Sequence, residues 1–205
     1  RPWLLFAHGA GAPSSSPWMR RWSDYLRELG HVVTFDYPYM QARKKMPDRM
    51  PTLIEAHRAE LAKVRAQAGD ARVFLVGKSM GSRVGCHLSL EEHVDGLVCF
   101  GYPLVSGSSG KLRDEVLVAL RTPILFLQGT HDTLCPIPKL EDVRVRMTAP
   151  SWLYPIQDAN HARAAISGAS RAQNVGNISA KTADAIKAKA RAKLDSHRKS
   201  RGFAE

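Results

Sequence analysis

Short apolar runs alternate with longer polar or amphipathic stretches along most of the chain. The runs are almost continuous in apolar character instead of alternating with polar residues, a pattern typical of strands that are buried on both faces of a sheet. We predict six such strands, at residues 3–7 (WLLFA), 31–35 (HVVTF), 73–76 (VFLV), 96–100 (GLVCF), 124–127 (ILFL) and 152–155 (WLYP).

The stretches between these runs carry the signals of helices. The first follows three serines that suit a helix N-cap, and it stops at Gly30. We expect helices at residues 17–29, 52–68, 80–91, 112–120 and 138–147. Strands that alternate with helices at this spacing form βαβ units. The predicted fold class is therefore α/β, a three-layer α/β/α sandwich around a mainly parallel six-stranded sheet, without a cap domain.

The chain of 205 residues is long enough for one domain with a full hydrophobic core. We assign residues 1–165 to this domain and residues 166–205 to a basic C-terminal loop and helix, either packed on the domain or partly disordered. The net charge of +11 lies mainly in the tail, since the residues from 162 onward hold 10 Lys/Arg against 3 Asp/Glu, a net +7. A solvated basic helix is the simpler interpretation, so we do not expect nucleic acid as a partner.

Composition narrows the class of protein further. No apolar run approaches the roughly 18 residues of a membrane span, and no signal peptide precedes the first strand. Three cysteines without a CxxC pair argue against a disulfide framework or a zinc site. We therefore expect a cytoplasmic protein without a metal site or membrane association. The sequence begins at Arg1 without an initiator Met, which leaves open whether its N-terminus is trimmed.

The stretch VFLVGKSMGS at residues 73–82 joins a buried strand directly to a Gly-x-Ser-x-Gly motif. In a parallel α/β sheet, binding and chemistry collect beyond the carboxyl ends of the strands. Ser79 follows such an end, on a tight strand-to-helix turn where Gly77 and Gly81 leave room for neighbouring backbone. We predict that Ser79 is a nucleophile.

Asp132 and His161 follow two later strands, so the three candidates occur in the chain order Ser, Asp, His. A serine hydroxyl needs a base to take its proton, and imidazole titrates near neutral pH. A carboxylate fixes the tautomer of that imidazole. We assign the base to His161 and the acid to Asp132, with Asp158 as the rival acid. His8 is expected to brace the glycine-rich loop after the first strand.

A negative oxygen that develops during acyl transfer needs hydrogen-bond donors. The N–H of Met80 is one candidate, because it follows the nucleophile at a helix N-terminus. The second is expected from the loop after the first strand, at Ala10 or Gly11. Four side chains at strand ends could line a pocket, with a structural or partly exposed rim position as the alternative: Tyr37, Tyr39, Lys78 and Tyr102.

Five motifs carry a family resemblance: HGAGAP (8–13), FDYPYM (35–40), GKSMGSR (77–83), CFGYPL (99–104) and LQGTHD (127–132). With these motifs the chain resembles the α/β-hydrolase superfamily, and more narrowly its small, cap-less, dienelactone-hydrolase-like branch. Within that branch it resembles the family that includes testis-expressed proteins and a subunit of a histone acetyltransferase complex. The resemblance implies a minimal α/β-hydrolase fold with the strand order 2-1-3-4-5-6.

The same resemblance implies that Ser79, Asp132 and His161 form a triad that hydrolyses an ester or related acyl bond without a metal or organic cofactor. The partner would be a small-molecule acyl substrate. The histidine of such proteins usually stands in a Gly-Asp-His turn, whereas this chain has Asp158-Ala159-Asn160-His161. The alternative function is a non-catalytic interaction module that keeps the fold and binds partners or nucleic acid through its basic tail.

Overall fold

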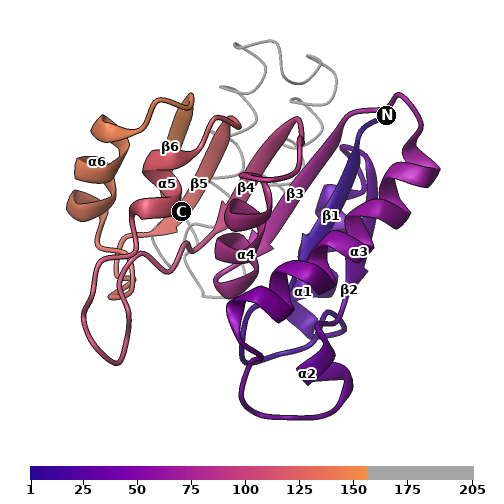
Figure 1. Ribbon diagram of the computed structural model, residues 1–205, viewed down its shortest axis with the longest axis horizontal. Helices are drawn as coiled ribbons and strands as arrows, with labels where there is room; N and C mark the ends of the chain where they lie inside the picture. Colours follow the sequence, from indigo (N-terminus) through magenta and orange to yellow (C-terminus); the bar gives the residue numbers. More distant parts are fainter. Residues whose placement is uncertain (157–205) are drawn as a thin grey trace, which may run out of the picture.

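The computed structural model describes residues 1–156. They form one six-stranded sheet in which every neighbouring pair of strands is parallel, in the order β2-β1-β3-β4-β5-β6 (Figure 1). The predicted fold class and strand order are therefore confirmed. The predicted tail at 166–205, and the predicted domain boundary at residue 165, lie outside the described residues.

All six predicted strands are present. Their bounds are β1 Trp3–Ala7, β2 His31–Phe35, β3 Val73–Lys78, β4 Gly96–Phe100, β5 Ile124–Gly129 and β6 Ser151–Ile156. β3 and β5 each run two residues further than the apolar pattern predicts. Strand geometry therefore continues to Lys78, directly before Ser79, and to Gly129, three residues before Asp132.

Within residues 1–156, six helices connect or cover the strands: α1 Pro17–Leu26, α2 Pro38–Gln41, α3 Met50–Ala68, α4 Met80–Leu88, α5 Glu115–Ala119 and α6 Ile137–Arg146. α1 begins as predicted, with Pro17 in its first turn and the Ser16 hydroxyl accepting from the Met19 N–H at 3.4 Å. α5 is shorter than predicted, because Leu112 instead forms an isolated bridge with Val105. The sequence analysis missed α2, since a single turn is too short to show a helical period.

The strands bury side chains on both faces of the sheet, as their continuous apolar character predicts. On one face, α1 covers a cluster made of Leu4, Phe6, Met19, Leu26, Val76 and Phe100. On the other face, a larger cluster joins the strands to α3, α4, α5 and α6, through side chains such as Leu61, Val84, Leu117 and Leu140. Helices therefore pack on both sides of the sheet, and the carboxyl ends of its strands remain free to carry a site.

Candidate active site

Ser79 lies between β3 and α4 in a backbone conformation that few residues other than glycine adopt, with φ 49° and ψ −111°. Such strain persists only where the surrounding structure holds it, and it is concentrated at functional sites. Here the Ser79 N–H donates to the Phe100 carbonyl at 2.9 Å, which ties the turn to the end of β4. The predicted sharp strand-to-helix turn is therefore present.

The two glycines of the motif are required by space. A Cβ atom on Gly77 would lie 2.2 Å from the Ser82 nitrogen, and one on Gly81 would lie 2.6 Å from the Ala7 carbonyl oxygen. In both cases the obstacle is backbone, which cannot swing aside. The Ser82 hydroxyl also donates to the Gly77 carbonyl at 2.6 Å and closes the turn from inside.

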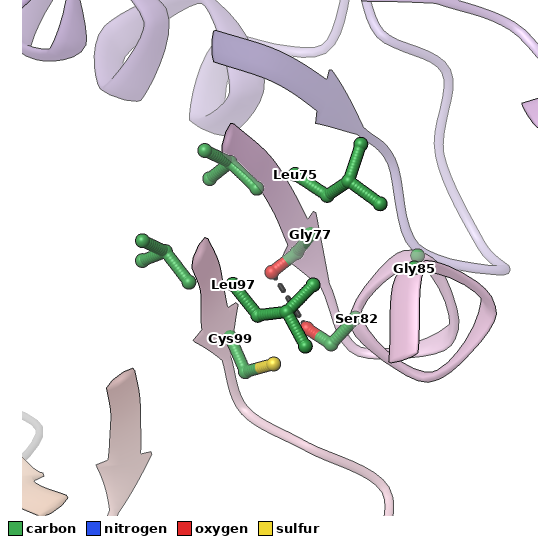
Figure 2. Close-up of a pocket in the computed structure, with 9 residues that line it drawn as sticks. Leu75, Gly77, Ser82, Gly85, Leu97 and Cys99 are labelled. Carbon is green, nitrogen blue, oxygen red and sulfur yellow. Dashed lines mark hydrogen bonds between the residues drawn. The ribbon is translucent and has the colours of Figure 1, made fainter. Parts of the chain in front are cut away.

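A narrow apolar space lies beneath this turn (Figure 2). Leu75, Gly77, Ser82, Leu97 and Cys99 line it, and it leaves no room for a water molecule. In Figure 2 the Ser82 side chain reaches from α4 to the backbone of β3 across the edge of this space. This space is an interior gap between α4 and two strands, and it is too small to receive a substrate.

His8 braces the loop after β1, as predicted. Its Nε2 accepts from the Tyr37 N–H at 3.1 Å, so the ring hydrogen must sit on Nδ1, which lies 2.6 Å from the Gly9 carbonyl oxygen. The bond from the Tyr37 N–H needs the neutral ring, because Nε2 can accept only when it carries no hydrogen. Burial lowers the pKa of His8 and favours that form.

The loop after β1 runs directly past the nucleophile. A Cβ atom on Gly9 would lie 3.6 Å from the Ser79 Cβ and 3.4 Å from the Lys78 carbonyl oxygen. Ala10 and Gly11 follow at once, half-buried and exposed respectively. Met80 begins α4, and within residues 1–156 its N–H meets no hydrogen-bond acceptor. The predicted donors thus come from two segments that lie on either side of Ser79.

Asp132 follows β5, and two donors fix its carboxylate. Oδ2 accepts from the Gln128 side-chain amide at 2.8 Å, and Oδ1 accepts from the Leu134 N–H at 2.9 Å. The Oδ2 atom points towards the end of β4, since a Cβ atom on Gly101 would lie 3.6 Å from it. The Ser79 N–H donates to the Phe100 carbonyl on the other side of the end of β4. Ser79 and Asp132 therefore flank the turn that follows β4.

Gln128 was missed by the sequence analysis. Its side chain is fully buried, and its Oε1 atom accepts from the Tyr102 N–H at 2.9 Å while its amide nitrogen holds Asp132. One amide therefore sets the position of the predicted acid relative to the segment after β4. A polar residue at the end of a buried strand, four positions before Asp132, was the available signal.

The three tyrosines at strand ends lie in the interior. Tyr37, Tyr39 and Tyr102 are each at most 1% exposed, so the alternative of a partly exposed rim is wrong. The Tyr37 hydroxyl lies 3.1 Å from His57 Nδ1, and the Tyr39 hydroxyl donates to the Ala10 carbonyl at 3.0 Å. Contact of these rings with a substrate stays a prediction.

Lys78 differs from the tyrosines because it is only half-buried. Its ammonium lies 4.5 Å from the centre of the Trp18 ring, and it meets no carboxylate among the described residues. Partial burial lowers its pKa.

Cys135, close to Asp132 in sequence, is buried, and that burial raises the pKa of its thiol to about 12, so it stays protonated.

His161 and the rival acid Asp158 lie outside the described residues. The role of His161 as base therefore stays a prediction. Within residues 1–156 no group of three or more His, Cys, Asp or Glu side chains could hold a metal ion. No helix in that part of the chain is both long and apolar enough to cross a membrane.

A parallel sheet with a serine on a strained strand-to-helix turn is the arrangement of an α/β hydrolase. Residues 1–187 match the alpha/beta hydrolase domain family, and the chain belongs to that family. The narrower dienelactone-hydrolase-like branch stays a prediction.

Solved structures share the fold at low identity. One is an alpha-beta serine hydrolase homologue from Coxiella burnetii, with 17% identity over 77% of this chain and 75% of that chain, and a TM-score of 0.65. A putative hydrolase of the alpha/beta superfamily from Xanthomonas campestris has 21% identity over 92% and 99%, with a TM-score of 0.58. A cold-adapted esterase from an Arctic intertidal metagenomic library has 14% identity over 76% and 73%, with a TM-score of 0.60.

Proposed function

We propose that this protein is a serine hydrolase that cleaves an ester or related acyl bond. In this proposal Ser79 is the nucleophile, Asp132 the acid and His161 the base. The observation that carries it is the strained conformation of Ser79, which the Gly77 and Gly81 contacts enforce beside a donor-rich loop. A serine with a purely structural role would have no need for this conformation.

The reaction follows from the placement of these groups. The Ser79 hydroxyl attacks the acyl carbonyl while His161 accepts its proton, and Asp132 orients the imidazole. The N–H groups of Met80 and of Ala10 or Gly11 stabilise the oxyanion. The protonated His161 then gives its proton to the leaving group, and an acyl-Ser79 ester remains. Water, deprotonated by His161, hydrolyses this ester and restores the enzyme.

Gln128 supports the assignment of the acid. Because its amide donates to Oδ2 and the Leu134 N–H donates to Oδ1, the carboxylate of Asp132 is held in one orientation before any histidine arrives. Preorganisation of this kind is what a triad acid requires, since it must fix an imidazole ring without rearranging.

Labelling with a fluorophosphonate probe tests the proposal without knowledge of the substrate. We expect peptide mapping to place the adduct on Ser79, and labelling to disappear in Ser79→Ala. It should fall sharply in His161→Ala and Asp132→Ala. Ser109→Ala is the matched control, because Ser109 is exposed on a loop after β4 and should label like the wild type.

The alternative function is a non-catalytic interaction module that uses the basic C-terminal tail. It predicts that well-folded wild-type protein does not label at all, and that deletion of residues 180–205 removes partner binding. Labelling at any serine other than Ser79 would contradict both the proposed nucleophile and the mechanism above.

A further inference from the structure

The loop after β1 cannot hold its own shape. Its sequence Gly9-Ala10-Gly11-Ala12-Pro13 offers no side chain that could hydrogen-bond to the backbone. Two glycines in five residues also make its unrestrained backbone unusually free. An oxyanion donor must nevertheless be fixed before the reaction begins, since moving it into place during the reaction would cost the free energy by which it stabilises the transition state. The restraint on this loop must therefore come from His8, directly before it, and from other segments.

The segment after β2 supplies that restraint at three points. The Tyr37 N–H donates to His8 Nε2 at 3.1 Å at the start of the loop. The Tyr39 hydroxyl donates to the Ala10 carbonyl at 3.0 Å in its middle. The Asp36 carboxylate accepts from the Ser14 N–H at 2.6 Å at its end. Three residues within the stretch 36–39 thus hold the loop from one side, while Ser79 lies against Gly9 on the other.

Two contacts hold the carbonyl oxygens of the peptide units whose N–H groups are the candidate oxyanion donors. The Gly9 carbonyl belongs to the same planar unit as the Ala10 N–H, and the Ala10 carbonyl to the same unit as the Gly11 N–H. A trans peptide holds its C=O and N–H in opposite directions, so fixing the oxygen also fixes the direction of the hydrogen. His8 Nδ1 holds the first oxygen at 2.6 Å, and the Tyr39 hydroxyl holds the second at 3.0 Å.

We propose that Tyr39 is a positioning residue for the oxyanion site: its buried hydroxyl, which lies 3.0 Å from the Ala10 carbonyl oxygen and 3.5 Å from that of Gly9, helps to aim the N–H groups of Ala10 and Gly11 at the acyl oxygen on Ser79. This inference rests on the proposed function. Tyr39 does not touch the reacting atoms in this account. It acts only through the peptide units it orients.

Tyr39 is itself well anchored for this task. Its ring is 1% exposed, and its backbone N–H donates to Asp48 Oδ2 at 2.9 Å. Burial, helped by the nearby Asp36 and Asp48 carboxylates, raises the pKa of Tyr39 to about 12. The hydroxyl therefore keeps its hydrogen at neutral pH and remains a donor. Pro38 restricts the backbone at the start of the same turn.

Tyr39→Phe is the test variant, because it removes one oxygen and keeps the ring. Tyr154→Phe is the matched control: it also removes a buried tyrosine hydroxyl, but from β6, which has three strands between it and β1 in the sheet. We expect Tyr39→Phe to lower kcat on a p-nitrophenyl ester about tenfold to a hundredfold, with KM changed less than about twofold. Tyr154→Phe should keep the wild-type kcat even if its melting temperature falls as much.

A second readout does not depend on activity. Nitrogen-15 relaxation on the full chain should show lower order parameters for the Ala10 and Gly11 amides in Tyr39→Phe, to below about 0.6, and unchanged values in Tyr154→Phe. Unchanged amides and unchanged kcat in Tyr39→Phe would overturn the inference, as would an equal loss of kcat in both variants. If wild-type protein neither labels nor turns over while Tyr39→Phe still loosens these amides, the proposed function fails and the restraint on the loop stands.

Discussion

The side-chain amide of Gln128 holds the carboxylate of Asp132, with 2.8 Å between Nε2 and Oδ2, and its other end accepts from the Tyr102 backbone. A single fully buried residue thus connects the predicted acid to the segment after β4, next to the strand that carries Ser79. The position of Asp132 therefore depends on one amide side chain, which donates to Asp132 through its nitrogen and accepts from the Tyr102 N–H through its oxygen.

Gln128→Glu should impair both folding and catalysis. The variant keeps the size of the side chain but replaces the donor with a second carboxylate, which would face Asp132 in the interior. We expect the free energy of unfolding to fall by roughly 1–3 kcal/mol and kcat to fall more than KM changes. Urea denaturation and steady-state kinetics measure the two effects. Gln67→Glu, on the exposed surface of α3, is the control and should be neutral.

Gly77→Ala and Gly85→Ala should have opposite effects. A Cβ atom on Gly77 would meet backbone at 2.2 Å, so we expect a loss of several kcal/mol and little folded protein. A Cβ atom on Gly85 would meet its nearest neighbour at an ordinary 3.6 Å, beside the narrow space in Figure 2. It should stabilise α4 by roughly 0.5–1 kcal/mol. Thermal unfolding compares the two, and equal destabilisation would contradict the reading of these contacts.

His57 should make the protein sensitive to acid. The side chain is fully buried, and burial lowers its pKa from 6.5 to about 3. Between these values the unfolded chain binds a proton that the folded chain excludes. The stability that His57 contributes is therefore complete above about pH 6.5 and is lost as the pH falls towards 3. His57→Leu should be less stable at pH 7, having lost its bond to Tyr37, but its unfolding free energy should vary less from pH 7 to 4. An equally steep profile in both proteins would refute this role.

Lys78 should favour substrates that carry a negative charge near the scissile bond. Its ammonium is half-buried over Trp18 without a carboxylate partner among the described residues, and its stem lies 3.7 Å from a Cβ placed on Gly9, next to Ser79. For an ester that bears a carboxylate, Lys78→Met should lower kcat/KM about tenfold, as expected for a lost charge-assisted contact. A neutral ester of the same size should be little affected. Lys63→Met, on α3, serves as the control, and equal losses on both esters would argue against charge recognition.

The sequence predicts those parts of the site that depend on local order along the chain. A buried strand that runs into Gly-Lys-Ser-Met-Gly leaves few arrangements other than a sharp turn, and the structure has that turn at Ser79. Asp132 could be placed after β5 for the same reason, because strand ends are visible as changes in apolar character. The strand order came from resemblance to a family, since apolar runs alone do not say which strands are neighbours.

The contacts that hold the site in place could not be predicted. Gln128 reaches the backbone of Tyr102, and the Tyr39 hydroxyl reaches the Ala10 carbonyl, across 26 and 29 residues of sequence. Such pairings depend on which strands lie side by side and on the direction of single side chains. For the same reason a partly exposed rim was a reasonable alternative for the three tyrosines: a residue at a strand end can be deep or exposed with the same sequence pattern.

The strand order also places the candidate nucleophile and the candidate acid in two separate parts of the sequence. Because β1 lies between β2 and β3, the loop after β1, the segment that restrains it and the nucleophile all come from residues 1–88, and the Ser79 N–H joins them to β4 by its bond to the Phe100 carbonyl. Asp132 arrives separately, on β5 and the loop that follows. A recombination event within residues 89–95, between α4 and β4, would transfer the nucleophile together with the loop after β1 and exchange β4, β5 and β6 along with the acid. Chimaeras joined at that turn are therefore a natural route to new acid loops on an unchanged nucleophile.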